Sequence, residues 1–284
     1  MYQLVVLDLD MTIIDRNLAI PPRTRQVVAD LRTAGVKVMI ATGRMFCSAR
    51  PFALQLGLHD MPLIAYNGAL VKDVASGATL YHRPLDLSVA KAVARLAEEW
   101  GVHWQAYLDD RLYVRALNEK ARRYMQIAAV PAHPVGNLHY WLSAPPTKVL
   151  IFEDPPVLAA FSDEVRKQCP GQVHITTSAP YFLEITGPGV SKRAAVQALL
   201  TGYGLEPQQV LAAGDSFNDL ELLEYVGCGV AMGSAPQEVQ ARADYVTGNV
   251  AADGLAIALE RLVLGRDGIG ASANGKNLPA EIKI

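Results

Sequence analysis

Two carboxylates follow directly on an apolar run near the start of the chain. Residues 4–7 (LVVL) are apolar, and Asp8, Asp10 and Thr12 stand at alternate positions after them. In an extended chain alternate side chains point to the same side, so we expect Asp8 and Asp10 to share one face at the end of a buried strand. Two like charges held together are unfavourable unless a cation or a proton relieves them. The pair indicates a metal or acid–base site or, on its own, merely an acidic turn after a core strand.

Further polar residues follow other apolar runs or open a helix. They are Thr42, Gly43 and Arg44 after residues 36–41, Gly214, Asp215, Asn218 and Asp219 after residues 210–213, and Lys192 after a glycine-rich turn. The carboxyl ends of parallel strands lie at one edge of a sheet, where open α/β sheets bind their ligands. We therefore expect these residues to converge with Asp8 and Asp10 on one site.

The residue types at this edge suit phosphate and a hard cation. The donors that suit phosphate oxygens are Thr42, the Gly43 N–H, Lys192 and Asn218. A helix N-terminus, such as the one that Lys192 opens, adds partial positive charge. Carboxylates at Asp8 and Asp215 suit Mg²⁺, which takes oxygen ligands and prefers only one or two carboxylates.

Together these groups could transfer a phosphoryl group through a covalent intermediate. Asp8 would attack phosphorus and form an aspartyl phosphate. Mg²⁺ and Lys192 would offset the repulsion between the anionic nucleophile and the anionic substrate. Asp10 would protonate the leaving oxygen and then take a proton from the water that hydrolyses the intermediate.

Each cluster taken alone also has a bland interpretation. Lys192 fits a solvated lysine at a helix start, and Asp215 fits a turn closed by its own side chain. Arg44 fits contact with the substrate and packing against an acidic neighbour equally well. The order of the four clusters, each after a strand or at a helix start, favours the functional interpretation.

The spacing of apolar residues predicts an α/β fold. The runs that fit buried strands are 4–7, 36–41, 63–66, 210–213 and 228–231, with helical spacings between most of them. Alternation of strand and helix is the pattern of a parallel sheet covered on both faces. We therefore expect a Rossmann-like doubly wound parallel core.

A second kind of pattern interrupts this core. Between residues 83 and 187 hairpin-like strands and helices are mixed, and the first pattern returns from Val190. We predict a discontinuous core at residues 1–82 and 188–264, and an inserted α+β cap domain at residues 83–187. The tail at residues 265–284 has little apolar content and is expected to be frayed.

Composition and charge narrow the choice of partners. The 284 residues are 51% hydrophobic and carry a net charge of −2, so no nucleic acid and no anionic membrane is expected as a partner. No apolar stretch is long enough to span a bilayer, and no signal segment opens the chain. We interpret Cys47, Cys169 and Cys228 as reduced core or near-core thiols and expect a cytoplasmic location. Nothing in the sequence indicates the oligomeric state.

The four clusters resemble, in order, the four motifs of the haloacid dehalogenase (HAD) superfamily. These motifs are DLDMT at 8–12, TGR at 42–44, GVSK at 189–192 and GDSFND at 214–219. The chain also resembles the Cof-type subfamily of this superfamily, at the segments NGA (67–69), GVAM (229–232) and DG (253–254). The resemblance implies a Rossmann-like core with a type IIB αβ cap between the second and third motifs.

The resemblance also implies roles for individual residues. Asp8 would be the nucleophile and Asp10 the acid and base. Mg²⁺ would be bound by the carboxylates of Asp8 and Asp215 and the main-chain carbonyl of Asp10. The residues expected in support are Thr12, Arg44 and Asp219. Met11 stands where the family commonly has glycine, and we expect it to narrow the space beside the nucleophile.

The expected function is that of a Mg²⁺-dependent phosphatase of small phosphorylated metabolites, with sugar phosphates as the preferred class. An inserted cap would sequester a compact ester and hinder a macromolecular one. The candidates for contacting the substrate from the cap are Tyr107, Asn118, Arg122, Tyr181 and Glu184. One alternative is a receiver-type signalling protein that keeps its phospho-aspartate. The other is a sugar phosphomutase that returns the group to a sugar hydroxyl.

Overall fold

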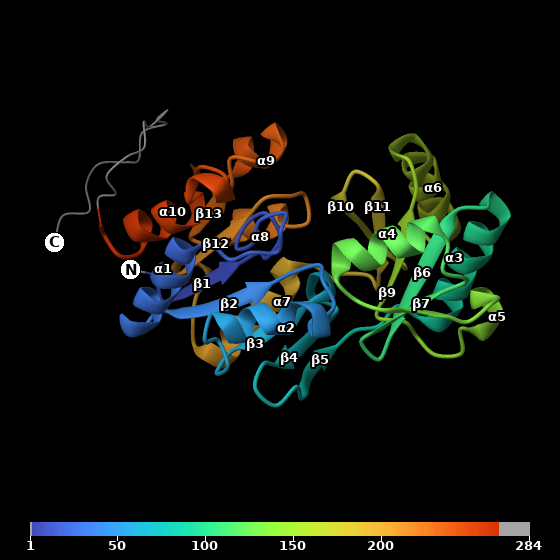
Figure 1. Ribbon diagram of the computed structural model, residues 1–284, viewed down its shortest axis with the longest axis horizontal. Coiled ribbons are helices and arrows are strands. Elements are labelled where there is room, and N and C mark those ends of the chain that lie inside the picture. Colours follow the sequence, from blue (N-terminus) through green and yellow to red (C-terminus); the bar gives the residue numbers. More distant parts are fainter. Residues whose placement is uncertain (1, 267–284) are drawn as a thin grey trace.

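Two β-sheets organise the molecule (Figure 1). A computed structural model describes residues 2–266. The first sheet has the strand order β14-β13-β12-β1-β2-β3-β4-β5, and the second has the order β10-β11-β9-β6-β7-β8. The second sheet is thus formed by strands that lie between β5 and β12 in the chain. Across the part of the chain described, the structure contains no helix long and apolar enough to cross a membrane.

Six neighbouring strands of the first sheet are parallel. They are β1 (Leu4–Leu7), β2 (Lys37–Ala41), β3 (Pro62–Ala65), β12 (Val210–Gly214), β13 (Cys228–Ala231) and β14 (Tyr245–Val246). In the register of β1 with its two neighbours, Leu7 lies beside Ile40 and Ala213. The chain therefore leaves β1, β2 and β12 at the same edge, where the predicted site residues follow.

Helices cover both faces of this sheet. Those on one face are α1 (Pro22–Thr33), α2 (Phe46–Gln55) and α10 (Gly254–Leu262), and those on the other are α7 (Lys192–Tyr203), α8 (Leu220–Tyr225) and α9 (Gln237–Arg242). Alternate residues of β1 enter different cores, with Val5 and Leu7 in one and Leu4 and Val6 in the other. Burial on both faces explains the uninterrupted apolar run, and the predicted doubly wound core is confirmed.

An antiparallel hairpin that the sequence did not reveal extends the first sheet. β4 (Leu70–Asp73) pairs with β3 and with β5 (Thr79–His82). All four residues of β5 are exposed, so this edge strand lacks the apolar pattern that identifies a buried one. The turn before the hairpin is the 3-10 helix η1 (Tyr66–Gly68). Two more such turns, η2 (Pro207–Gln209) and η3 (Val250–Ala252), precede β12 and α10.

The second sheet and its helices form the cap. Its strands are β6 (His103–Leu108), β7 (Arg111–Val114), β8 (Ala132–Pro134), β9 (Lys148–Phe152), β10 (His174–Ala179) and β11 (Phe182–Thr186). Its helices are α3 (Leu87–Trp100), α4 (Glu119–Ala128), α5 (Leu138–Trp141) and α6 (Pro155–Gln168). One sheet face packs against α3, α5 and α6. The other face carries Leu150 and Phe182 together with Tyr124 of α4, and these belong to the same apolar cluster as the core.

The fold class predicted from the sequence is confirmed, including the mixed α/β cap. The domain limits at residues 82 and 188 stay a prediction. Most of the tail, residues 267–284, lies outside the described residues. One expectation was wrong: Cys47 is exposed at the start of α2, whereas Cys169 and Cys228 are buried as expected.

Candidate active site

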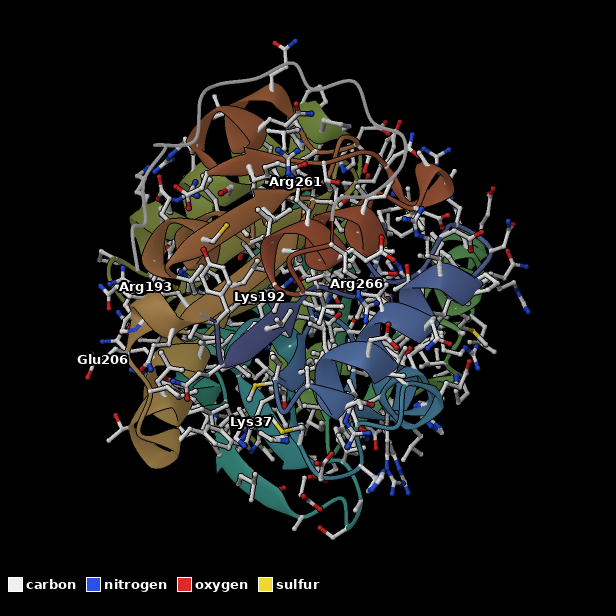
Figure 2. The ribbon with its side chains drawn as sticks, turned by 90° about the vertical axis from the view of Figure 1, so that its left-hand side faces the viewer. Lys37, Lys192, Arg193, Glu206, Arg261 and Arg266 are labelled. Atoms are coloured by element: carbon white, nitrogen blue, oxygen red, sulfur yellow. The ribbon has the colours of Figure 1, made fainter. Side chains whose placement is uncertain are left out.

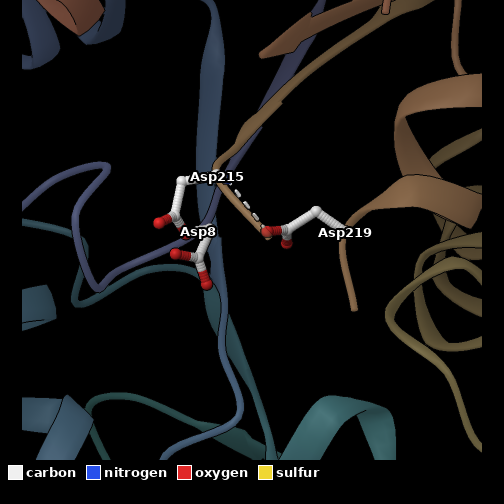
Figure 3. Close-up of side chains that lie close together, drawn as sticks. All are labelled: Asp8, Asp215 and Asp219. Carbon is white, nitrogen blue, oxygen red and sulfur yellow. Dashed lines mark hydrogen bonds between the residues drawn. The ribbon is translucent and has the colours of Figure 1, made fainter. Parts of the chain in front are cut away.

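Three aspartates from two segments meet at the carboxyl edge of the core sheet (Figure 3). Asp8 follows β1, Asp215 follows β12, and Asp219 immediately precedes α8. One carboxylate oxygen from each lies within 4.8 Å of the others. The parallel pairing of β1 and β12 produces this convergence, because both strands end at the same level.

Lys192 joins two of these carboxylates. Its Nζ donates to Asp8 Oδ1 at 2.5 Å and to Asp219 Oδ1 at 2.6 Å, and the lysine is 1% exposed. Lys192 is the first residue of α7, where the Ser191 side chain accepts a bond from the Ala194 N–H as the helix cap. In Figure 2 Lys192, which is buried, lies near the centre of the view, whereas Arg193, which is exposed, lies at its edge.

The cluster carries more negative than positive charge. Three carboxylates face one ammonium group, and burial raises the pKa of Asp8 well above its usual range, although Lys192 opposes the shift. Burial, followed by the charge of Asp219, raises the pKa of Asp215 to about 7. Such an excess of buried negative charge is relieved by a bound cation or by protonation. The all-oxygen donor set suits a hard divalent ion such as Mg²⁺.

Asp219 also holds the backbone of the turn that carries Asp215. Its Oδ2 accepts from the Asp215 N–H and the Ser216 N–H, both at 3.1 Å. The same carboxylate therefore bonds Lys192 through one oxygen and the turn through the other. Asp219 therefore lies beside the cluster, and its supporting role stays a prediction.

The side chain of Asp10 is paired with Arg44. Arg44 Nε donates to Asp10 Oδ2 at 2.8 Å, and Arg44 Nη2 donates to Asp10 Oδ1 at 2.6 Å. The Arg44 side chain is 10% exposed, while that of Asp10 is 47% exposed. Arg44 thus packs against an acidic neighbour, and the other role open to it, contact with the substrate, stays a prediction. Asp10 and Asp8 both line one cavity, as their spacing predicted.

The other predicted phosphate ligands surround Gly43. Asn218 Nδ2 donates to Asn67 Oδ1 at 2.9 Å, beside the Gly43 backbone. Thr42 is fully buried, and its Oγ1 accepts from the Arg44 N–H at 3.1 Å. Thr12 is also fully buried, and its Oγ1 has no hydrogen-bond partner among residues 2–266. The roles assigned to these threonines stay predictions.

A cavity of about 250 Å³ opens above Asp8 between core and cap. Its lining from the core includes Asp8, Asp10, Met11, Gly43, Arg44, Asp215 and Asn218, and its lining from the cap includes Tyr124, Ile127, Phe182 and Glu184. A second cavity of about 700 Å³, bounded by α6 and β10, shares Asp215 and Asn218 with the first. Asp8, Asp10 and Asp215 thus lie beside a space large enough for a small metabolite.

The sequence identified the cap wall of this cavity only in part. Of the five cap residues proposed to contact the substrate, Glu184 lines the smaller cavity, and Tyr124 and Phe182 were missed. Met11 lines it too, and the narrowing expected beside the nucleophile stays a prediction. Met11 has φ +56°, a left-handed conformation that glycine adopts without strain.

The cap closes on the core through a turn of its own. Asp110, between β6 and β7, accepts from the N–H groups of Phe46 and Cys47 at 3.0 and 2.7 Å. These N–H groups open α2, whose partial positive charge favours a carboxylate. The Tyr66 hydroxyl donates to Asp110 at 2.8 Å, and Ser48 of α2 donates to the Ala128 carbonyl of α4 at 2.7 Å.

The turn η1 fixes the start of α7 against the core sheet. Gly68 has φ +99°, and a Cβ there would stand 2.4 Å from the Ser191 carbonyl oxygen. Since Ser191 is the N-cap residue of α7, this close approach fixes the position of the helix start and therefore of Lys192, its first residue. A side chain at position 68 would displace the helix start.

A doubly wound α/β core, a carboxylate cluster at its carboxyl edge and an inserted cap define a capped α/β enzyme. The sequence profile of haloacid dehalogenase-like hydrolases matches residues 5–259. The chain belongs to this family, which confirms the resemblance seen in its motifs.

Individual relatives agree with this assignment. The 5-amino-6-(5-phospho-D-ribitylamino)uracil phosphatase YitU of Bacillus subtilis is 31% identical over 261 residues, which cover 89% of this chain and 94% of the relative. A haloacid dehalogenase-like hydrolase from Bacteroides thetaiotaomicron superposes with a TM-score of 0.84 at 27% identity, covering 92% of this chain and all of the other. A solved sugar phosphatase of HAD subclass IIB, at 24% identity and a TM-score of 0.82, covers 92% and 98% and shares the fold.

Proposed function

We propose that this protein is a Mg²⁺-dependent phosphatase that hydrolyses phosphomonoesters of small metabolites through an aspartyl phosphate. The observation that carries the proposal is the contact of Lys192 with Asp8 and Asp219 in a buried, acid-rich cluster beside a cavity between core and cap. Family membership supports a hydrolase, and the relative from Bacillus subtilis is named as a phosphatase of a phosphorylated metabolite.

In this mechanism Asp8 is the nucleophile. Lys192 bonds Asp8 Oδ1, and Oδ2 has no hydrogen-bond partner within residues 2–266, so that oxygen can form the new bond to phosphorus. As this bond forms, the ester P–O bond breaks and the leaving oxygen receives a proton from Asp10. Water then attacks phosphorus, Asp10 takes its proton, and phosphate and the free Asp8 carboxylate are released.

Arg44 shapes the part that Asp10 plays. Both Asp10 oxygens accept bonds from the guanidinium group, which can only donate. To deliver a proton to the leaving group, Asp10 must give up one of these bonds, and its 47% exposed side chain has room to do so.

Mg²⁺ would be held by the carboxylates of Asp8 and Asp215 and by the main-chain carbonyl of Asp10, with Asp219 in support. Carboxylate oxygens of Asp8, Asp215 and Asp219 converge within 4.8 Å, and oxygen donors are what this ion selects. When bound, the ion supplies positive charge that offsets the repulsion between Asp8 and the substrate phosphate. Lys192 supplies a second positive charge, and Gly43 and Asn218 are placed to donate to phosphate oxygens.

The substrate class follows from the size and walls of the cavities. The closed cap leaves about 250 Å³ over Asp8 and a further 700 Å³ beside it, space for a phosphorylated sugar or polyol and not for a protein. Residues 83–187 act as the cap in this proposal and exclude bulk water when closed. A cytoplasmic location, which phosphorylated metabolites would require, stays a prediction.

The two alternatives differ in the fate of the phosphoryl group. A receiver-type protein would keep it on Asp8, and a phosphomutase would return it to a sugar hydroxyl. Both would lack sustained release of inorganic phosphate. The family match over residues 5–259 is to hydrolases, which favours phosphatase activity over either alternative.

Phosphate release decides among these functions. With p-nitrophenyl phosphate and Mg²⁺ we expect many turnovers per protein molecule, and we expect a chelator to stop them. A panel of phosphorylated metabolites, scored by release of free phosphate, would then rank hexose, pentose and polyol phosphates. A single turnover without release would support the receiver, and isomerised sugar phosphate without release would support the mutase.

A further inference from the structure

A chain of hydrogen bonds runs from the cap to the candidate phosphate site, and the mechanism above does not use it. Glu184 Oε2 accepts from Asn67 Nδ2 at 2.5 Å, and Asn67 Oδ1 accepts from Asn218 Nδ2 at 2.9 Å. Asn218 Oδ1 in turn accepts from Ser216 Oγ at 2.5 Å. Glu184 belongs to the cap strand β11, whereas Asn67 belongs to η1 of the core and the other two residues to the core loop between β12 and α8.

The carboxylate sets the direction of this chain. An ionised carboxylate only accepts hydrogen bonds, while an amide has one donating and one accepting end. Asn67 must therefore present its amino end to Glu184 and its carbonyl end to Asn218. Asn218 must then present its amino end to Asn67, so that a donor faces Gly43: Asn218 Nδ2 lies 3.6 Å from the place of a Gly43 Cβ.

Glu184 is held firmly enough to impose that direction. Lys148 Nζ donates to Glu184 Oε1 at 2.8 Å and to the Gly43 carbonyl at 2.9 Å, and Ser178 donates to the same Glu184 oxygen at 3.1 Å. The side chains of Lys148 and Glu184 are 1% and 4% exposed. A buried, paired carboxylate with both oxygens bonded has no alternative partner to turn to.

Asn67 is held equally firmly on the core side. Tyr66 and Asn67 have φ of +51° and +56°, two successive non-glycine residues in the left-handed region. Such strain persists where the surrounding structure imposes it, commonly at functional sites. Here the Asn67 N–H donates to the Thr42 carbonyl at 2.9 Å, which joins the turn to the loop that carries Gly43.

The chain exists only when the cap lies against the core. Glu184 and Lys148 both belong to the cap, whereas Asn67 and Gly43 both belong to the core. Opening the cap would keep the Lys148–Glu184 pair together and break its two bonds to the core. Asn67 and Asn218 would then lose the group that fixes which amide ends face the phosphate site.

We propose that Glu184 is a positioning residue that, acting through Asn67, turns the amino group of Asn218 toward the substrate phosphate when the cap closes. The inference rests on the proposed phosphatase function and adds to it a link between cap closure and phosphate affinity. Lys148 holds Glu184 in place, and Asn67 transmits the direction. The closed cap thus completes the phosphate site in addition to excluding water.

The test uses an almost isosteric change, Glu184→Gln, in the full chain with Mg²⁺. Glutamine can present an amino end to Asn67, so both asparagine amides are free to reverse and a carbonyl can face the phosphate. We expect the inhibition constant of inorganic phosphate against p-nitrophenyl phosphate turnover to rise about tenfold, as for a lost charge-assisted bond. Asn67→Ala should give a similar rise.

The double variant separates positioning from general damage. Because Glu184 acts through Asn67, Glu184→Gln combined with Asn67→Ala should bind phosphate no more weakly than Asn67→Ala alone. The matched control is Glu153→Gln, which changes the same residue type in the cap pair Lys120–Glu153, away from the core. The control should leave the phosphate inhibition constant within twofold of the wild type.

Three outcomes would overturn the inference. They are an inhibition constant within twofold of the wild type in folded Glu184→Gln, losses that multiply in the double variant, and an equal rise in the Glu153→Gln control. Glu184→Gln could fail to fold because Lys148 loses its partner. In that case Asn67→Ala alone provides the test, and an unchanged inhibition constant of phosphate in that variant would overturn the inference. Absence of turnover in the wild type would instead refute the phosphatase proposal itself.

Discussion

Among residues 2–266, two buried lysines bond carboxylates, one in the core and one in the cap. Lys192 is 1% exposed and contacts Asp8 and Asp219, with the third carboxylate of Asp215 close by. Lys148 is equally buried and contacts a single carboxylate, Glu184, together with a backbone carbonyl. The two sites share a residue type and a depth of burial and differ in their balance of charge.

That balance distinguishes a reactive cluster from a structural one. A one-to-one buried pair can be satisfied by its own hydrogen bonds, and its main use is to fix geometry. Three carboxylates around one ammonium group cannot be satisfied in this way, and burial raises the pKa of Asp8 and Asp215. The core cluster therefore favours the arrival of a cation, whereas the cap pair is complete without one.

The strongest test of this contrast is Asp8→Asn. The substitution keeps the shape of the side chain and removes the nucleophile, so we expect kcat to fall by at least about 10⁴-fold with the fold intact. Steady-state turnover of p-nitrophenyl phosphate measures the loss, and circular dichroism checks the fold. Asp163→Asn, an exposed aspartate of the cap, is the matched control. Near-normal turnover in Asp8→Asn would exclude the covalent route.

Replacing each lysine by methionine compares the two sites directly. Lys192→Met should lower kcat by about 10³-fold, because it removes positive charge from the reacting group. Lys148→Met should cost about tenfold, mainly in KM, because it disturbs the placing of Glu184 and Gly43. Equal losses of kcat in both variants would show that the difference in charge balance has no chemical meaning.

Mg²⁺ should stabilise the core cluster through its charge. At a concentration about 100 times its dissociation constant, Mg²⁺ should raise the free energy of unfolding by about 2.7 kcal/mol, and Asp215→Asn should greatly reduce this gain. Glu184→Gln, a change in the cap, should keep it. Thermal unfolding with Mg²⁺ and with a chelator gives the comparison.

The stability of the metal-free protein should also depend on pH, and thermal unfolding measures this dependence. The pKa of Asp215 is raised to about 7 in the folded state, so this carboxyl favours folding at low pH. This contribution should be lost as pH rises from about 4 to about 7, because the unfolded carboxyl releases its proton near the ordinary pKa of 3.8 while the folded one keeps it until about 7. Wild-type stability that rises over this range relative to Asp215→Asn would contradict the assignment.

The smallest expected effect comes from the turn that joins cap and core. Asp110→Ala removes the carboxylate that binds the start of α2, which should destabilise the closed cap by about 1 kcal/mol. We expect kcat/KM to fall by about fivefold with little change in thermal stability of the core. Asp109→Ala, in the same turn, is the control.

The convergence of Asp8, Lys192 and Asp215 could be predicted from sequence for a simple reason. Parallel strands of similar length end together, so residues that follow them must meet whatever the remaining packing. Lys192 was predicted to join them because it begins a helix after a glycine-rich turn. These relations depend on topology alone, which the alternation of strands and helices indicates.

Other parts of the site depend on choices that topology leaves open. Arg44 could reach either a substrate or Asp10, and only the side-chain geometry shows that it reaches Asp10. Tyr124 and Phe182 face the cavity because of how the cap lies on the core, which their local spacing does not reveal. The β4–β5 hairpin was missed because its outer strand is exposed on both sides.

The close approach of Gly68 to the Ser191 carbonyl has a consequence for how this chain can evolve. A Cβ at 2.4 Å from a backbone oxygen cannot be accommodated by a change of rotamer, because neither atom can move with a flexible side chain. In a saturation library, position 68 should tolerate substitution as poorly as the nucleophile does, although glycine has no functional group to lose. The contact with the Ser191 carbonyl therefore constrains position 68 through backbone geometry alone.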